Sequence, residues 1–159
     1  MKEKAKEVIK QERLEHARAS RFMRKALSNY PNINYYFTIV KDPNSTTSDE
    51  EWLKALRKYF SECATRYGIM VMGLKVSFEM CDHVHFRGFA NLTPEYLSKQ
   101  ELEKTRTRPK LYAIPFIREK FGINHFYNIK NGSPELFMGT VKYITRFGSD
   151  YKYINVDKR

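Results

Sequence analysis

Two consecutive segments near the middle of the chain alternate between polar and apolar residues, and this alternation constrains the fold most strongly. Polar residues stand at the odd positions of segments 75–79 and 83–87, and apolar residues stand between them. Because successive side chains of a strand point to opposite faces, each segment is expected to be a strand with one buried face. Three residues, 80–82, join them, so the pair is expected to form an antiparallel hairpin.

The remaining segments predict a mixed α and β order around this hairpin. Helices are expected over 2–28, from a capping box at Ser48 and Glu51 to about 67, from Thr93, over 115–121 and over 134–147, and strands over 34–40, 69–80, 83–91 and 124–130. This order predicts an α+β fold of ferredoxin-like or RRM-like type, an antiparallel sheet with helices on one face and an open face for a metal or DNA. With 159 residues, a basic helix (1–29) and one domain (30–159) are expected.

The hairpin also predicts a metal site, through its register. If residues 80–82 form the loop, Glu79 pairs with His83 and Ser77 with His85, so that polar residues face polar ones. Glu79, His83 and His85 would then converge on the open face as ligands suited to Mn²⁺ or Mg²⁺, and also acceptable to Zn²⁺. Arg87 on the same face is expected to hold a phosphate.

The charge of the chain favours a polyanionic partner. Lys and Arg number 29 against 18 Asp and Glu, a net charge of +11, and nucleic acid is a common partner of such proteins. Arg106 and Arg108 lie in a basic segment expected to be a DNA-contacting loop. The N-terminal helix holds about half of the excess charge, and we interpret it as a solvated helix covering the domain rather than as a DNA contact.

Cysteine content and hydropathy suggest a compartment. Cys63 and Cys81 make no disulfide framework, and together with His125 they fit no standard zinc spacing. The N-terminus has no apolar signal core, and no apolar run is long enough to span a bilayer. We therefore expect a protein of the reducing host cytoplasm.

The last predicted helix, residues 134–147, carries a tyrosine that could act as a nucleophile. Phe137, Val141 and Ile144 form one stripe expected to pack on the sheet, and Tyr143 lies on the neighbouring stripe. A free phenol has a pKa of about 10, so attack on phosphorus requires a neutralised phosphate and a stabilised phenolate. Arg146, expected to be catalytic, or Lys142 is placed to help with the second, and Lys142 is also expected to contact DNA. Packing alone is the alternative role for Tyr143.

Taken together, these motifs resemble those of the HUH endonuclease family, and more closely those of its rolling-circle replication initiators from plasmids and single-stranded DNA viruses. His83-Val84-His85 matches the His-hydrophobe-His motif. Segment 36–40 stands at the place of the first family strand, and segment 143–147 resembles the family's tyrosine motif. The resemblance spans residues 34–147.

The resemblance implies a mechanism and a set of partners. Tyr143 would nick single-stranded DNA at a replication origin with a divalent metal, leaving a 5′-phosphotyrosine and a free 3′-hydroxyl that can later reverse the step. The third metal ligand varies within the family and is carried onto Glu79 by the register above. Arg146 replaces the usual Lys, and Phe147 replaces the second tyrosine of two-tyrosine members, so a single-tyrosine enzyme is implied. A helicase and a second copy of the chain are further partners compatible with the family.

Three alternatives remain open from the sequence. A related single-strand transposase or relaxase would share the chemistry, but Phe147 and the late tyrosine fit those groups less well. An RRM-like module binding RNA or single-stranded DNA is suggested by Arg87-Gly88-Phe89-Ala90, although Asn91 stands where an aromatic residue should stack on a base. A catalytically inactive HUH domain is the third.

Overall fold

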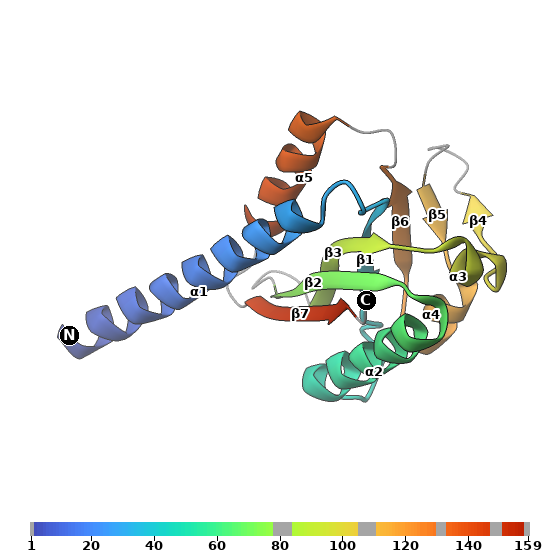
Figure 1. Cartoon of the computed structure of the whole chain (residues 1–159). Coiled ribbons are helices and arrows are strands. Elements are labelled where there is room, and N and C mark those ends of the chain that lie inside the picture. The colour runs from blue at the N-terminus through green and yellow to red at the C-terminus, as the bar shows by residue number, and fades with distance from the viewer. Residues whose placement is uncertain (1, 78–83, 105–110, 130–132, 147–150, 158–159) are drawn as a thin grey trace.

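A seven-stranded antiparallel sheet forms the centre of the molecule (Figure 1). The computed structural model describes residues 2–77, 84–104, 111–129, 133–146 and 151–157. The strand order is β4-β5-β6-β1-β3-β2-β7. The strands are β1 (Tyr35–Val40), β2 (Met70–Ser77), β3 (Val84–Asn91), β4 (Glu103–Lys104), β5 (Leu111–Ala113), β6 (Asn124–Asn128) and β7 (Tyr151–Asp157). The predicted α+β class is confirmed.

Among the described residues, five helices pack on this sheet or extend from it: α1 (Lys2–Asn29), α2 (Asp49–Tyr67), α3 (Pro94–Ser98), α4 (Pro115–Lys120) and α5 (Pro134–Arg146). The predicted cap of α2 is present, because the Ser48 hydroxyl accepts a hydrogen bond from the Glu51 amide at 3.2 Å. Gly68 ends α2 in the left-handed conformation at φ 73°. In the described part of the chain, no helix is long and apolar enough to cross a membrane.

One face of the sheet is buried beneath α2 and α4, and the residues between them form what we call the first core. Phe37 and Ile39 of β1 and Phe86 of β3 are at most 1% exposed on this face. The side of α2 that meets them carries an apolar stripe at helical spacing: Trp52, Leu53, Leu56, Phe60 and Cys63. Each large apolar side chain buried in this way stabilises the fold by about 1.5–3 kcal/mol.

The other face is partly covered by α1 and α5, so the prediction of helices on one face only is wrong. Phe22 and Ala26 of α1 are fully buried there, together with Phe137 and Val141 of α5. The reason lies in β2, where alternate residues point to this second face and are all buried: Met70, Met72, Leu74 and Val76. A strand that is apolar on both sides must be covered on both sides. The second face stays open further along, since His125 of β6 is exposed.

The register of the central hairpin also differs from the prediction. Ser77 pairs with Val84 and Val76 with His85, whereas the prediction paired Ser77 with His85. A shift of one residue moves each side chain to the other face. His85 and Arg87 therefore share their face with Val76 and Leu74. Matching polar with polar residues misled the prediction because β2 is buried on both faces.

A pair of tyrosines in the first core predicts a loss of stability in alkali. The hydroxyls of Tyr59 and Tyr96 lie 2.9 Å apart, and burial is the main cause that raises the pKa of both tyrosines. Below pH 10 both are neutral in the folded and unfolded chains, so they add no pH dependence. Above about pH 10 only the unfolded chain ionises readily, so the free energy of unfolding falls by up to about 1.4 kcal/mol per pH unit and tyrosine.

This prediction is checked by urea unfolding at pH 9, 10 and 11. The double variant Tyr59→Phe/Tyr96→Phe removes both hydroxyls together, so that neither tyrosine is left without the other, and the buried Cys63 thiol loses its hydrogen bond to Tyr59. Its free energy of unfolding should fall less steeply between pH 10 and 11 than that of the wild type. Parallel pH profiles for the two proteins would show that the pair does not titrate with unfolding.

Candidate functional site

Strand β3 presents His85 and Arg87 on the second face of the sheet. They alternate with Val84 and Phe86, which are 2% and 1% exposed in the first core. This alternation fixes the direction of both polar side chains, because the apolar neighbours anchor the strand from the other side. His85 and Arg87 are half-buried, and the Nε2 atom of His85 and the Nε atom of Arg87 are shielded from solvent.

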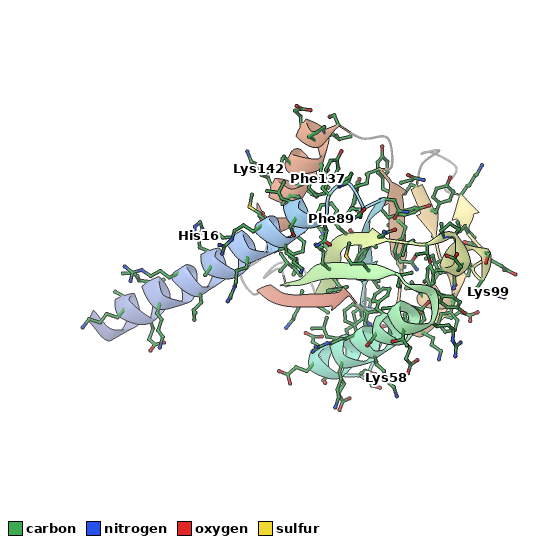
Figure 2. The ribbon with its side chains drawn as sticks, in the orientation of Figure 1. His16, Lys58, Phe89, Lys99, Phe137 and Lys142 are labelled. Carbon is green, nitrogen blue, oxygen red and sulfur yellow. The ribbon has the colours of Figure 1, made fainter. Side chains whose placement is uncertain are left out.

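Helix α5 holds Tyr143 above the same face. The predicted stripe of Phe137, Val141 and Ile144 is buried, at 3%, 0% and 3% exposure. The ring of Phe137 lies 5.0 Å from that of Phe89 on β3 (Figure 2). Tyr143, on the neighbouring stripe, is 54% exposed. A tyrosine this exposed contributes little to the core.

A continuous set of contacts joins the histidine to the tyrosine. The Cζ atom of Arg87 lies 5.6 Å from the centre of the Tyr143 ring, a cation–π distance. The Nη2 atom of the same arginine lies 3.3 Å from Nδ1 of His85. The sheet and α5 thus bring together an imidazole, a guanidinium and a phenol from two distant parts of the chain.

The contact between Arg87 and His85 determines the state of the imidazole. A guanidinium has only hydrogen-bond donors, so Nδ1 of His85 accepts and the ring proton of the neutral imidazole sits on Nε2. A metal needs a lone pair on one of these nitrogens. To bind a metal through Nε2, the ring must carry its proton on Nδ1 instead. His85 can therefore bind a metal through Nε2 only after Arg87 releases Nδ1.

The other two predicted metal ligands, Glu79 and His83, lie outside the described residues. Within the described part, no group of three or more His, Cys, Asp or Glu side chains is close enough to hold a metal. The register that led to Glu79 is wrong in the described part of the hairpin, where Val76 rather than Ser77 pairs with His85. The argument that selected Glu79 as a metal ligand therefore fails. The prediction of His83 as a ligand did not depend on this pairing.

A row of polar residues extends from Arg87 across the sheet. Thr38 on β1 pairs with Arg87 on one side and with His125 of β6 on the other, so all three side chains share the face below α5. From the sequence, His125 was considered only as a zinc ligand together with the two cysteines. Cys63 is buried in the first core on the opposite face, so that combination is excluded. Only the pairing of β1 with two strands reveals the row, and no local motif signals it.

The structure places the predicted DNA contacts and the predicted catalytic residue Arg146 only in part. Lys142 is exposed on α5, next to Tyr143 (Figure 2). The Arg146 side chain lies outside the described part, although its backbone continues α5. Arg106 and Arg108 lie outside the described residues altogether. A Cβ added at Gly139, one turn before Tyr143, would meet no described atom within 4 Å, so this side of α5 offers room beside the tyrosine.

Comparisons with protein-family models, with curated proteins and with solved structures find no match.

Proposed function

We propose that the protein nicks and rejoins single-stranded DNA through Tyr143, as a sequence-specific initiator of rolling-circle replication. One observation carries the proposal. The exposed phenol of Tyr143 lies against Arg87, and Arg87 in turn contacts His85 of the His-hydrophobe-His motif. A tyrosine held only by packing would have no reason to share its surroundings with these two groups.

The chemistry assigned to Tyr143 is a transesterification. Its phenolic oxygen forms a bond to the phosphorus of a backbone phosphodiester while the bond from phosphorus to the 3′-oxygen breaks. The phenol gives up its proton, and the departing 3′-oxygen takes one up as a hydroxyl. The product is a 5′-phosphotyrosine, and attack by a 3′-hydroxyl in the reverse direction rejoins the strand and frees the tyrosine.

Arg87 has two roles in this proposal. Its guanidinium lies over the Tyr143 ring at a cation–π distance and so helps to orient the tyrosine. It also suits a phosphate, to which it can donate two parallel hydrogen bonds. A strand on this face would draw Arg87 from Nδ1 of His85 towards a phosphate, and this movement would free the imidazole.

His83 and His85 are the residues we assign to a divalent cation, Mn²⁺ or Mg²⁺. When bound, the cation would supply Lewis-acid neutralisation of the phosphate. Imidazole and oxygen donors fit these ions. Of these two histidines, His85 lies in the described part of the chain. Its ring lies on the same face as Tyr143, and it can bind the cation only after Arg87 moves away.

Three further features support this proposal. The strand order β6-β1-β3-β2, with α2 and α4 over one face, is compatible with the ferredoxin-like arrangement that we propose. The net charge of +11 suits a polyanion. Phe89, the aromatic residue of the RNP1-like segment, is fully buried against Phe22 and Phe137, so it cannot stack on a base as an RNA-binding module would need.

Replacing His85 tests the metal part of the proposal. In His85→Ala, cleavage of an origin-derived single-stranded oligonucleotide in Mn²⁺ should fall at least about a hundredfold, because phosphate neutralisation in the transition state is lost. The measurement is the initial rate of product formation on a denaturing gel over a range of Mn²⁺ concentrations. Binding of the same oligonucleotide in a chelator should stay within a few-fold of the wild type.

The matched control is His16→Ala, which removes an exposed histidine from α1 (Figure 2). It should cleave at the wild-type rate. Cleavage by His85→Ala at the wild-type rate, with the same requirement for Mn²⁺, would mean that His85 holds no catalytic metal.

A further inference from the structure

Helix α1 extends well beyond the domain that it joins. It has 28 residues, or about 42 Å at 1.5 Å per residue. Among the described side chains of α1, the fully buried ones are Phe22 and Ala26 in its C-terminal turns. Every side chain described between residues 5 and 17 is exposed, and Figure 1 shows this half of α1 projecting from the sheet. The prediction that α1 covers the domain is wrong for these turns.

The projecting helix carries a basic stripe, formed by Lys6, Lys10, Arg13 and Arg24. Offsets of four, seven and eighteen residues from Lys6 return to one side of an α-helix. All four side chains are exposed. Arg13 stands nine residues before Phe22, about two and a half turns of helix, and therefore lies on the side of α1 opposite the buried Phe22. The stripe thus faces away from the domain. The acidic residue of α1 with a described side chain, Glu7, follows Lys6 directly and lies about 100° from the stripe.

The rest of the helix surface argues against two other occupants. The exposed apolar residues Val8, Ile9 and Leu14 lie on different sides of α1. A helix lying on a membrane needs one continuous apolar face, and a helix that pairs with a second copy needs an apolar seam with a seven-residue repeat. The basic stripe would also repel its own copy.

We infer that the basic stripe of α1 is a docking surface for the phosphate backbone of a DNA double helix. Lys6, Lys10 and Arg13 lie within about 10.5 Å along the helix axis, and Arg24 lies about 16.5 Å further along, so the stripe spans about 27 Å, comparable to eight base pairs. A rigid helix about 10–12 Å across also matches the width of the major groove of B-DNA. This surface is separate from Tyr143, so duplex binding does not depend on the proposed cleavage.

The test neutralises part of the stripe in the full chain. The variant Lys6→Gln/Lys10→Gln/Arg13→Gln keeps good helix formers at exposed positions, so its circular dichroism spectrum and Tm should match the wild type. The probe is a fluorescent 20-base-pair DNA duplex, with affinity measured by anisotropy between 50 and 200 mM salt. We expect affinity to fall roughly a hundredfold at 100 mM salt, and the slope of log K against log salt concentration to become shallower by about 2 to 3.

A matched control removes the same charge elsewhere. Lys54→Gln/Arg57→Gln/Lys58→Gln neutralises three exposed cations of α2, on the opposite face of the sheet (Figure 2), and should leave the salt slope unchanged. Tyr143→Phe should also bind the duplex like the wild type, whether or not the chain cleaves DNA.

Four outcomes would overturn the inference. The first is an equal loss of duplex affinity in the α1 and α2 variants, since net charge alone would then act. The second is an unchanged salt slope in the α1 variant. The third is tighter binding of the wild type to phosphatidylserine vesicles than to the duplex, lost in the α1 variant, which would make the occupant a membrane. The fourth is a wild-type dimer in sedimentation that the α1 variant abolishes.

Discussion

Tyr143→Phe should form no covalent adduct with an origin-derived single-stranded oligonucleotide in Mn²⁺, a loss of at least about a thousandfold against the wild type. The variant lacks only the oxygen that would bond to phosphorus. Because the Tyr143 ring is 54% exposed and the core beneath α5 is made by its neighbours, the fold should be unaffected. The measurement is the shifted protein band on a denaturing gel, and the Kd for the same oligonucleotide in a chelator should remain near the wild-type value.

The control for this result is Tyr67→Phe, which removes a partly buried hydroxyl at the end of α2. It should form the adduct at the wild-type rate. If Tyr143→Phe still forms the adduct, another group is the nucleophile and the contact with Arg87 has no catalytic meaning.

Gly88→Ala should destabilise the protein by at least about 3 kcal/mol. An alanine Cβ at this position would lie 1.9 Å from the carbonyl oxygen of Met72 and 2.5 Å from the Cα of Gly73. Both are backbone atoms of β2, so no side-chain rotation relieves the clash and the two strands must separate. A loss of this size should lower Tm by roughly 6–12 °C, measured by thermal unfolding, and should displace His85 and Arg87 with β3.

Gly139→Ala is the matched control. Its Cβ would meet no described atom within 4 Å, and alanine favours a helix over glycine by about 1 kcal/mol. This variant should keep or slightly raise the Tm. Equal stability of Gly88→Ala and the wild type would show that β2 and β3 do not approach as closely as the structure places them.

Local sequence patterns were sufficient for much of the fold. The capping box at Ser48, the expected end of its helix near residue 67 and the apolar stripe of segment 134–147 all correspond to observed elements. β7 was not predicted, because its position depends on pairing with the distant β2 at the edge of the sheet. The mid-strand glycines were a missed signal: Gly73 and Gly88 pair with each other, and glycine inside a strand often marks a close approach of backbones.

The sequence predicted individual residues of the candidate site better than it predicted their arrangement in space. The alternation in segment 83–87 correctly placed His85 and Arg87 on one face, because strand periodicity is a local property. The register was wrong because it assumed one buried face, while Leu74 and Val76 are buried on the face that carries the histidine. The contact of Arg87 with Tyr143 joins residues far apart in sequence, and only the packing of α5 on Phe89 creates it.

Peptide mapping of the covalent adduct tests the central claim most directly. Trypsin cuts after Lys142 and Arg146, so Tyr143, Tyr151 and Tyr153 fall in three different peptides with one tyrosine each. After reaction with the oligonucleotide and nuclease digestion, mass spectrometry should find the nucleotide mass on the peptide 143–146. A nucleotide on another tyrosine peptide, or no adduct in Mn²⁺ with an origin strand, would contradict the assignment of Tyr143 as the nucleophile.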